Sequence, residues 1–382
     1  MSLLARLALV SLLLSPLPVL AEVPPPPELA ARSWVLMDAA SGSVLVDHEG
    51  SVRLPPASLT KLMTSHVAAL ELQRGRLKED TRVLIGEKAW RMGGSKMFVM
   101  VGDQVTVSDL LRGIIVQSGN DASIALAEHI AGSEETFASM MNQEAKRLGM
   151  ADTQFRNATG WPDPEHYSSA LDMAKLARAI ILEDPAHYSL YKEKEFVWNG
   201  IKQPNRNLLL WRDPSVDGLK TGHTEEAGYC LVASGKRDAT RLIAVVFGTD
   251  SEEARATETA KLLGYGFSFF ESKVFHKQGE AIQSVDVWKG AARSVKAGVA
   301  ADFAAALPKR DAGGYQTRVV LKEGDVIAPI AAGAALGRVE LVSTDGKVVM
   351  QAPLVALEAV EEGGFFRRMW DSLRLFFRGL FG

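Results

Sequence analysis

The sequence of 382 residues contains one cysteine, Cys230, so no disulfide within the chain can hold the fold together. Its seven histidines lack the spacings of a zinc site, and no glycine-rich phosphate-binding loop follows a strand-like segment. We therefore expect neither a metal ion nor a cofactor. The formal net charge of -3 gives no excess of basic residues of the kind that binds nucleic acid, so nucleic acid is not an expected partner.

The balance of residue types, 47% hydrophobic and 23% charged, is that of a globular protein and excludes a disordered, collagen-like or coiled-coil chain. At roughly 100–200 residues per domain, the length predicts two domains or one large domain with an appendage. The sequence contains no internal repeat. It leaves the oligomeric state open.

The apolar run at the N-terminus is too short to span a membrane. Leu7 to Leu20 is 14 residues long and is broken by two prolines, whereas a spanning helix needs about 20 apolar residues. A basic residue precedes this run, and Val19-Leu20-Ala21 resembles a signal-peptidase cleavage site. We predict that residues 1–21 are an export signal, and that the mature protein lies on the periplasmic side of the inner membrane as a peripheral protein.

The C-terminal tail, residues 365–382, has the pattern of an amphipathic helix. At about 100° per residue, nine apolar side chains fall on one arc and most polar side chains on the other. Four arginines and one aspartate give the tail a net charge of +3, and Gly363-Gly364 separates it from the preceding segment. The pattern favours an interfacial anchor on an anionic membrane surface. A helix docked on the body of the protein is the alternative. The apolar arc consists of Phe365, Phe366, Met369, Trp370, Leu373, Phe376, Phe377, Leu380 and Phe381.

Between the ends, the hydrophobic periodicity predicts an α+β domain over residues 28–270. Strands are expected at 33–38, 43–48, 229–234 and 241–248, and helices after Pro56 and at 110–116, 122–130, 170–182 and 252–267. We expect Ser108-Asp109 to cap the helix at 110–116, and residues 152–168 to form a loop. Short alternating segments over 271–362 predict a small β-sandwich.

Three short motifs in the first domain could carry chemistry. The first, Ser58-Leu59-Thr60-Lys61, begins the helix after Pro56, so the Lys61 amine lies one turn from the Ser58 hydroxyl. A serine is a weak nucleophile until a base takes its proton, and a desolvated lysine can be that base. Ser189-Leu190-Tyr191-Lys192 has the same spacing, but it is interpreted as a surface coincidence.

The second motif is Ser118-Gly119-Asn120, which lies between two predicted helices. It offers a hydroxyl that could pass a proton to a leaving amine and a carboxamide that could hold a peptide backbone. The third is the segment 217–224, which precedes a predicted strand. There Lys220 supplies a second cation, Thr221 a hydroxyl, and Gly222 allows a close approach of a substrate backbone.

In this order, Ser-x-x-Lys, Ser-x-Asn and Lys-Thr-Gly form the composite signature of penicillin-binding proteins and serine β-lactamases. With the export signal, the segment 205–211, the β-rich domain and the amphipathic tail, the chain resembles the low-molecular-mass penicillin-binding proteins that are serine-type D-alanyl-D-alanine carboxypeptidases. The resemblance implies a β-lactamase/transpeptidase-like catalytic domain. It also implies removal of the terminal D-Ala from peptidoglycan pentapeptide stems, and covalent binding of β-lactam antibiotics.

The resemblance further implies a role for each motif residue. Ser58 becomes the nucleophile, Lys61 its base and Ser118 the proton relay, while Asn120 orients the substrate. Lys220 and Thr221 contact the substrate, and Lys220 adds the positive potential that favours a neutral Lys61. The backbone N–H groups of Ser58 and His223 form the oxyanion hole. Arg206 is similar to an arginine that holds the substrate carboxylate, although a surface salt bridge is an alternative.

Two other functions fit parts of the sequence. A class A β-lactamase uses a loop glutamate for deacylation, and Glu165 lies in the loop 152–168. However, the asparagine expected four positions later is replaced by Ser169, and Thr159 stands where some carboxypeptidases have histidine. A non-catalytic penicillin-sensing or wall-binding module is the second alternative, and the three intact motifs argue against it.

Overall fold

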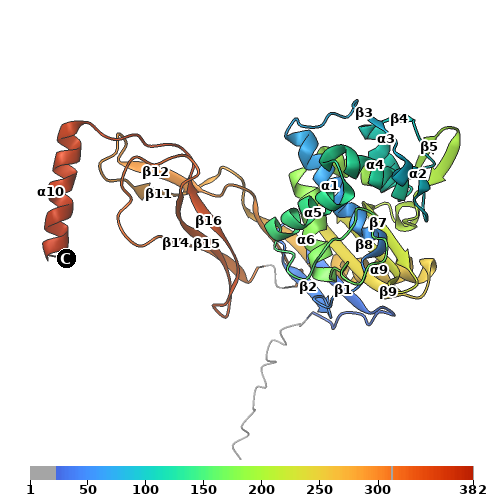
Figure 1. The fold of residues 1–382 in the computed structure, drawn as a ribbon. Helices are drawn as coiled ribbons and strands as arrows, with labels where there is room; N and C mark the ends of the chain where they lie inside the picture. Colours follow the sequence, from blue (N-terminus) through green and yellow to red (C-terminus); the bar gives the residue numbers. More distant parts are fainter. Residues whose placement is uncertain (1–22, 311–312, 382) are drawn as a thin grey trace, which may run out of the picture.

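The computed structural model describes residues 23–310 and 313–381 (Figure 1). The predicted export signal, residues 1–21, lies outside the described residues. The centre of the first domain is a five-stranded antiparallel sheet in the order β2-β1-β9-β8-β7. Strand β1 (Ser33–Asp38) pairs with β2 (Val44–His48) and with β9 (Thr240–Thr249). Strand β8 (Gly228–Arg237) joins β9 to the edge strand β7 (Val216–Thr224). The predicted strands of this domain are confirmed.

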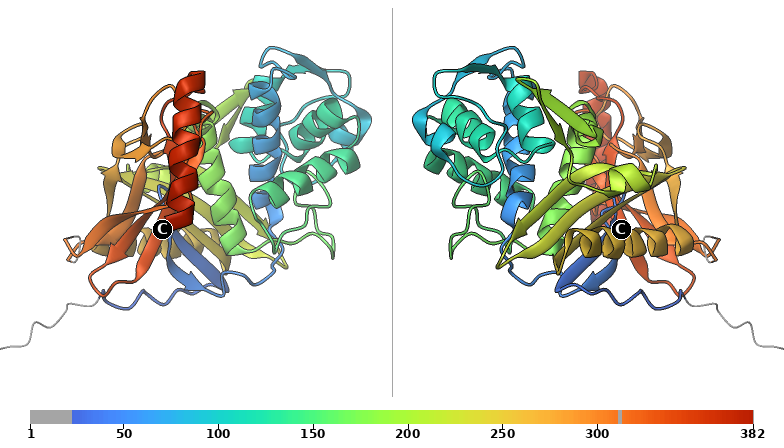
Figure 2. Two further views of the ribbon diagram at one scale, coloured as in Figure 1. Left: turned by 90° about the vertical axis from the view of Figure 1, so that its left-hand side faces the viewer. Right: turned by 90° about the vertical axis from the view of Figure 1, so that its right-hand side faces the viewer.

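The sheet separates two hydrophobic cores because alternate residues of each strand point to opposite faces. In β1, Val35 and Met37 belong to the core that α1 (Thr60–Gln73) and α6 (Ala170–Glu183) cover, whereas Trp34 and Leu36 face α9 (Glu252–Phe269). Figures 1 and 2 show α9 on the opposite side of the sheet from the other long helices. The domain is therefore a helix–sheet–helix sandwich, with β2 and β7 as the edge strands of its sheet.

The helices of the larger core confirm the predicted helical segments. The motif that begins at Ser58 lies on a 3₁₀ turn, η1 (Ala57–Leu59), which continues directly into α1. The longer helices are α1 (Thr60–Gln73), α3 (Val107–Ile115), α4 (Asn120–Ala131), α5 (Glu134–Arg147) and α6 (Ala170–Glu183). The shorter elements are β3 (Arg82–Leu84), α2 (Glu87–Arg91), β4 (Gln104–Thr106), α7 (Pro185–Tyr188), η2 (Ser189–Lys192), β5 (Glu195–Trp198), β6 (Ile201–Pro204) and α8 (Leu209–Arg212).

The predicted cap of α3 at Ser108-Asp109 is wrong by two residues. Thr106 is the N-cap, and its hydroxyl accepts a hydrogen bond from the Asp109 backbone N–H at 3.1 Å and donates to the Asp109 carboxylate at 2.6 Å. This reciprocal cap leaves Val107, which is completely buried, as the first helical residue. The Ser108 hydroxyl instead accepts a hydrogen bond from Arg112.

The second domain consists of two sheets around one core. A five-stranded sheet has the order β11-β12-β16-β15-β14, and β10 pairs with β13 in a two-stranded sheet. Phe303 and Leu307 of β13 and Val339 and Leu354 of the larger sheet belong to one hydrophobic cluster. The strands are β10 (Phe270–His276), β11 (Ala281–Asp286), β12 (Ser294–Gly298), β13 (Phe303–Pro308), β14 (Tyr315–Leu321), β15 (Ala335–Ser343) and β16 (Val348–Ala356).

The tail forms a helix, α10 (Phe365–Phe381), at the end of the β-rich domain farthest from the catalytic domain (Figure 1). Asp371 on its polar face is buried and accepts a hydrogen bond from the Lys289 backbone N–H at 2.8 Å. Arg374 and Arg378 lie over the ring of Trp288, and Arg378 also pairs with Asp325 at 2.9 Å. The helix therefore docks on the β-rich domain through its polar face.

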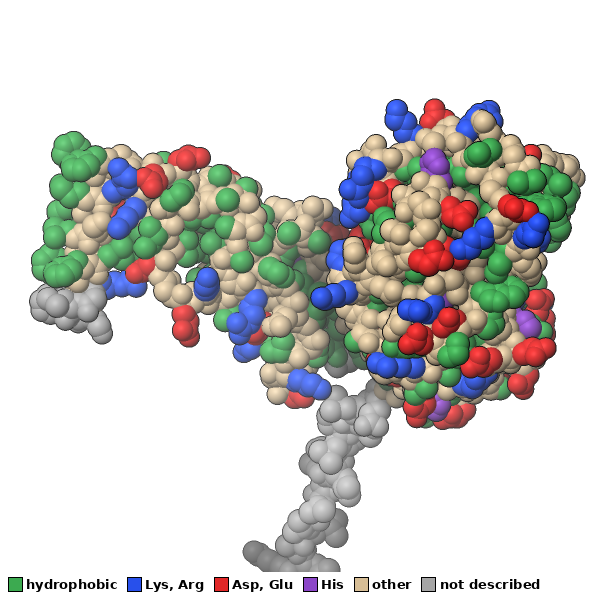
Figure 3. All heavy atoms as spheres, in the orientation of Figure 1, with side chains coloured by type: hydrophobic (Ala, Val, Ile, Leu, Met, Phe, Trp, Pro, Cys, Tyr) green, Lys and Arg blue, Asp and Glu red, His purple; other side chains and the backbone are tan. Residues whose placement is uncertain are grey.

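The apolar face of α10 points away from the body of the protein, as Figure 3 shows. Seven of its large apolar side chains are 47% to 78% exposed. Leu380 and Phe381 are also predicted to lie on this face, but their side chains are outside the described part of the chain. Among the described helices, none has both the length and the apolar character that crossing a membrane requires. The exposed side chains are Phe365, Phe366, Met369, Trp370, Leu373, Phe376 and Phe377.

Candidate active site

Ser58 and Lys61 meet at the junction between η1 and α1. The Lys61 Nζ atom lies 2.9 Å from Ser58 Oγ, which is the contact that the spacing of three predicts. Lys61 is 1% exposed, whereas Ser58 is partly exposed and lines a cavity of about 360 Å³. The structure thus places a buried amine against a hydroxyl that a substrate can reach.

Burial is the main cause that lowers the pKa of Lys61, to about 7. The positive charge of Arg206 lowers it further, and the negative charge of Asp121 acts in the opposite direction. Burial also holds the pKa of Lys220 well below its usual range, together with the charges of Lys61, Arg206 and Arg255. Lys220, the cation expected to favour a neutral Lys61, is not among the causes of the shift in the pKa of Lys61, and the positive charge that lowers this pKa is that of Arg206.

The loop 152–168 closes over the start of α1. Lys61 Nζ donates a hydrogen bond to the carbonyl oxygen of Thr159 at 2.7 Å, and the Thr64 hydroxyl donates to Ala158 O at 2.7 Å. Gly160 has a φ of +81°, and a Cβ atom there would lie 1.8 Å from Ala57 O. The backbone of this loop therefore packs directly on the turn that carries Ser58.

Ser118 lies between α3 and α4, Asn120 is the first residue of α4, and both line the same cavity as Ser58. Ser118 has a φ of +65° and is 3% exposed, and its Oγ has no hydrogen-bond partner among the described residues. The Asn120 side chain donates to Gly93 O at 2.8 Å, while its backbone N–H donates to Ser95 O at 2.7 Å. An unpartnered buried hydroxyl is costly, and it is available to a group that enters the cavity.

The third motif lies on the edge strand β7, which faces η1. Lys220 is buried and its Nζ donates to Thr221 O at 3.0 Å, while Thr221 lines the cavity. His223 also lines the cavity, and its ring stacks on Tyr229 with 3.9 Å between the centroids. The structure therefore gives the His223 imidazole a packing partner.

Gly222 lines the cavity and also packs closely on the turn that carries Ser58. A Cβ atom there would lie 3.0 Å from Pro56 O and 3.2 Å from Leu59 Cγ. These contacts belong to the turn that carries Ser58 rather than to the open cavity. Gly222 therefore allows β7 to pack closely on that turn, and its expected role in making room for a substrate backbone stays a prediction.

Two arginines extend the basic character of the cavity. Arg206 lines it, and its guanidinium donates to Ser95 Oγ at 2.7 Å, so its recorded partner is a hydroxyl rather than the carboxylate of a salt bridge. Arg255 of α9 also lines it and is 2% exposed. Its guanidinium contacts Arg206 O at 3.3 Å and Glu252 at 3.4 Å. No sequence pattern indicates Arg255, because no motif marks α9.

Comparisons with known proteins agree with this geometry. Residues 20–251 match the peptidase S11 family model, D-alanyl-D-alanine carboxypeptidase, and residues 270–362 match the C-terminal domain of penicillin-binding protein 5. The chain belongs to this carboxypeptidase family. It is 42% identical to the D-alanyl-D-alanine carboxypeptidase DacC of Escherichia coli over 93% of this chain and 90% of that protein.

Solved structures of penicillin-binding proteins resemble the carboxypeptidase in fold. Penicillin-binding protein 5 of Haemophilus influenzae has a TM-score of 0.81 and 42% sequence identity, and the match covers 88% of this chain and 99% of that one. Penicillin-binding protein 6B of Escherichia coli has a TM-score of 0.71 and 40% identity over 87% of this chain and 98% of that one. The predicted fold class and function are thereby confirmed, and the carboxypeptidase is a serine hydrolase.

Glu165, on which the β-lactamase alternative depends, lies on the surface. Its carboxylate lies 3.6 Å from Arg156, and its side chain is 67% exposed. The residues that line the cavity do not include it. The segment 189–192, which has the same Ser-x-x-Lys spacing, also lies on the surface, because Ser189 and Lys192 are both exposed on η2. Neither group can act on a substrate bound at Ser58.

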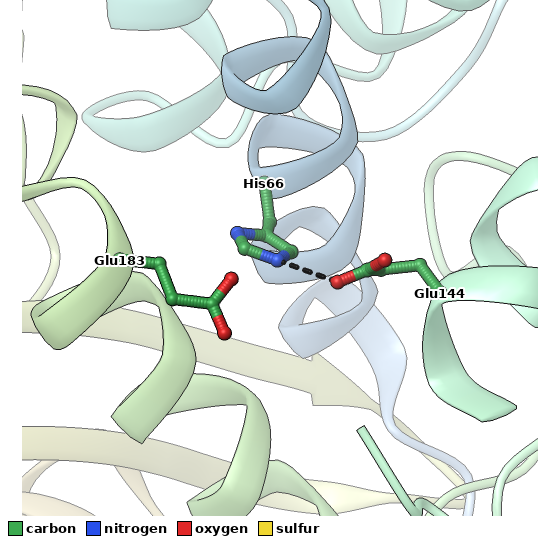
Figure 4. Close-up of side chains that lie close together, drawn as sticks. All are labelled: His66, Glu144 and Glu183. Atoms are coloured by element: carbon green, nitrogen blue, oxygen red, sulfur yellow. Dashed lines mark hydrogen bonds and ion pairs between the residues drawn. The ribbon is translucent and has the colours of Figure 1, made fainter. Parts of the chain in front are cut away.

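A separate polar cluster lies behind the cavity, where α1, α5 and α6 meet (Figure 4). His66 Nε2 lies 2.9 Å from Glu144, and potential ligand atoms of His66, Glu144 and Glu183 are all within 4.8 Å of one another. These residue types could hold a metal ion. However, Arg147 already donates to Glu144 at 2.6 Å and to Glu183 at 2.6 Å. We therefore interpret the cluster as an ion network that joins three helices.

Proposed function

We propose that the carboxypeptidase removes the terminal D-Ala from peptidoglycan pentapeptide stems through an acyl-enzyme on Ser58. The observation that carries the proposal is the 2.9 Å contact between Ser58 Oγ and a Lys61 amine with a pKa of about 7. A base acts most effectively when its pKa lies close to the working pH. β-Lactams, which mimic the D-Ala-D-Ala dipeptide, acylate the same serine.

The hydrogen bond to Thr159 supports Lys61 as the base. A neutral amine has two hydrogens and one lone pair. When one hydrogen is donated to Thr159 O at 2.7 Å, the lone pair can face the Ser58 hydroxyl. Ser58 Oγ then attacks the carbonyl carbon of the penultimate D-Ala while its proton moves to Lys61 Nζ. The negative charge on the carbonyl oxygen is stabilised by the backbone N–H groups of Ser58 and His223.

Ser118 completes the transfer of the proton. Its Oγ gives a proton to the nitrogen of the departing D-Ala and takes one from Lys61, so the C–N bond breaks and an ester with Ser58 remains. The lack of a protein partner for this buried hydroxyl supports the role, because the relay needs both its donor and acceptor positions. Water then hydrolyses the ester and releases the shortened stem peptide.

The cations around the cavity bind the carboxylate at the end of the substrate. Arg206 and Arg255 both line the cavity, and Lys220 and Thr221 lie on the adjacent strand. A guanidinium offers a planar set of donors that matches a carboxylate. Asn120 also lines the cavity, where its carboxamide can bind the backbone amide of the acyl half of the substrate.

Release of D-Ala from a pentapeptide tests this mechanism. We expect release by the wild-type enzyme and its loss in Ser58→Ala and Lys61→Met, because the first removes the nucleophile and the second the base. Ser189→Ala is the matched control and should retain full activity. A folded wild-type sample that releases no D-Ala, or a Lys61→Met variant as active as the wild type, would contradict the proposal.

We also propose that the enzyme is exported and attached to the outer face of the inner membrane through residues 365–382. The support comes from the orientation of α10, whose polar face docks on the β-rich domain while its apolar face is exposed. Exposed phenylalanine and tryptophan side chains next to arginines are typical of a helix that binds an anionic membrane surface.

Flotation with vesicles that contain phosphatidylglycerol tests the attachment. We expect the wild-type enzyme to float with the vesicles and the double variant Phe366→Ser/Trp370→Ser to remain in solution. Leu84→Ser/Val197→Ser removes two exposed apolar side chains of the catalytic domain and should float like the wild type. Equal flotation of both double variants would rule out α10 as the attachment site.

A further inference from the structure

Trp161 is a half-exposed aromatic side chain at the wall of the catalytic cavity. It lies in the loop 152–168, lines the same cavity as Ser58 and is 47% exposed. The residues that carry out the proposed reaction are polar, and the reaction assigns no role to the indole ring. A large apolar surface that remains open to solvent inside a substrate cavity is available to bind a ligand.

Asn157 holds the backbone of Trp161, and two glycines lie against its ring. The Trp161 backbone N–H donates to Asn157 Oδ1 at 3.1 Å, and its carbonyl oxygen accepts from Asn157 Nδ2 at 3.0 Å. The ring itself lies next to Gly93 and Gly94, where a Cβ atom at either glycine would come within 3.4 Å of it. The indole ring therefore packs against the backbone of the two glycines. Because this packing restricts the ring, it can bind a ligand with little loss of conformational entropy.

The neighbours of the ring indicate which half of the substrate it faces. A Cβ atom at Gly94 would lie 2.7 Å from the side-chain nitrogen of Asn120, so Trp161 and Asn120 flank the same two glycines. Asn120 is the residue proposed to bind the amide of the acyl half. The buried guanidinium of Arg255 instead lies beside Glu252 and Tyr229, with the residues proposed to bind the leaving carboxylate.

We propose that Trp161 determines specificity by binding the side chain of the stem residue that precedes D-Ala-D-Ala. This inference rests on the proposed function, because it assigns the acyl half of that substrate to the indole ring. The ligand class is an acyl group with an extended aliphatic or aromatic part, which packs its CH groups against the ring. The acylamino side chain of a β-lactam occupies the same position.

Two matched substrates separate this role from a general effect on catalysis. Diacetyl-L-Lys-D-Ala-D-Ala carries a long side chain, and acetyl-D-Ala-D-Ala ends before that residue. In Trp161→Ala we expect kcat/KM for the first substrate to fall about tenfold and for the second to change less than twofold, since a lost apolar contact costs about that factor. Trp161→Phe keeps an aromatic ring and should recover most of the loss.

Trp211→Ala provides the control, because Trp211 is 49% exposed but does not line the cavity. It should leave both values unchanged. The ratio of acylation rates for benzylpenicillin and 6-aminopenicillanic acid gives a second readout, and it should fall in Trp161→Ala alone. If Trp161→Ala lowers kcat/KM equally for both substrates, or for neither, the specificity role is wrong. If the wild-type enzyme releases D-Ala from neither substrate, the proposed function fails instead.

Discussion

The buried amine of Lys61 donates a 2.7 Å hydrogen bond to the carbonyl oxygen of Thr159, 98 residues further along the chain. Because the acceptor is a backbone atom, no side-chain substitution removes it without moving the loop. The contact orients the amine toward Ser58 and connects the reactivity of the nucleophile to the position of the loop 152–168.

The charge on Arg206 should set the pH at which acylation begins. Lys61 acts as a base only when it is neutral, and its pKa is about 7, so the rate constant for acylation by benzylpenicillin should rise as the pH increases through that value. Arg206→Gln removes a positive charge that lowers this pKa, so the rise should move to higher pH. Arg206→Lys, which keeps the charge, should leave it in place. An unchanged profile in Arg206→Gln would exclude this coupling.

The charge on Asp121 should shift the pH dependence of acylation in the opposite direction to that on Arg206. Its carboxylate raises the pKa of Lys61, and it also accepts hydrogen bonds from the backbone N–H groups of Met97 at 2.8 Å and Phe98 at 2.9 Å. In Asp121→Asn the rise in acylation rate should move to lower pH, and the melting temperature should fall. Asp172→Asn, which also changes a buried carboxylate, is the control and should lower only the melting temperature. A shift in the same direction as that of Arg206→Gln would be inconsistent with the assigned charges.

Two glycines with similar backbone angles should respond differently to alanine. Gly149 has a φ of +68° and open space around it, whereas a Cβ atom at Gly160 would lie 1.8 Å from Ala57 O. Gly149→Ala should cost about 1 kcal/mol of unfolding free energy from the left-handed backbone, with normal acylation. Gly160→Ala should cost more and should also slow acylation at least tenfold, because Ala57 precedes Ser58. Chemical denaturation and acylation kinetics measure both quantities, and equal effects at the two positions would count against loop packing as the cause.

The ion network behind the cavity should make stability depend on pH in the acid range. Burial alone would raise the pKa of Glu144, but hydrogen bonds from His66 and Arg147 bring it from 4.5 down to about 2. A carboxylate whose pKa is lower in the folded than in the unfolded protein stabilises the fold at any pH above the unfolded pKa. This contribution is lost as the pH falls toward about 2. Glu144→Gln should therefore lower stability at pH 6 and flatten the loss between pH 4.5 and 2. Urea unfolding at several pH values measures this. Glu165→Gln changes an exposed carboxylate outside the network and is the control, which should retain the wild-type slope.

Much of the architecture follows from local patterns in the sequence. The strands β1, β8 and β9 and the helices α1, α4, α6 and α9 were predicted because alternation and helical periodicity report which side chains are buried. The spacing of Ser58 and Lys61 also predicted their contact, since three residues make about one turn. The cap of α3 was misplaced because Thr106 and Ser108 offer the same chemistry, and only the burial of Val107 distinguishes them.

The residues that the sequence could not predict depend on contacts between distant segments. Arg255 reaches the cavity from α9, and Trp161 contacts Gly93 and Gly94 from a different loop. The packing of Gly222 on Pro56 likewise requires the sheet edge to be placed beside η1. A local sequence pattern does not show which distant segments contact each other. A motif therefore identifies the reactive groups but not the other residues that line the cavity.

The most direct test of the central claim is mass spectrometry of the enzyme after treatment with benzylpenicillin. Intact mass should show one adduct, and peptide mapping should place it on Ser58, which lies 2.9 Å from the base Lys61. The adduct should be absent from Ser58→Ala and present in Ser189→Ala. An adduct on Ser118, Ser189 or any other residue of the wild-type enzyme, or one that persists in Ser58→Ala, would contradict the account.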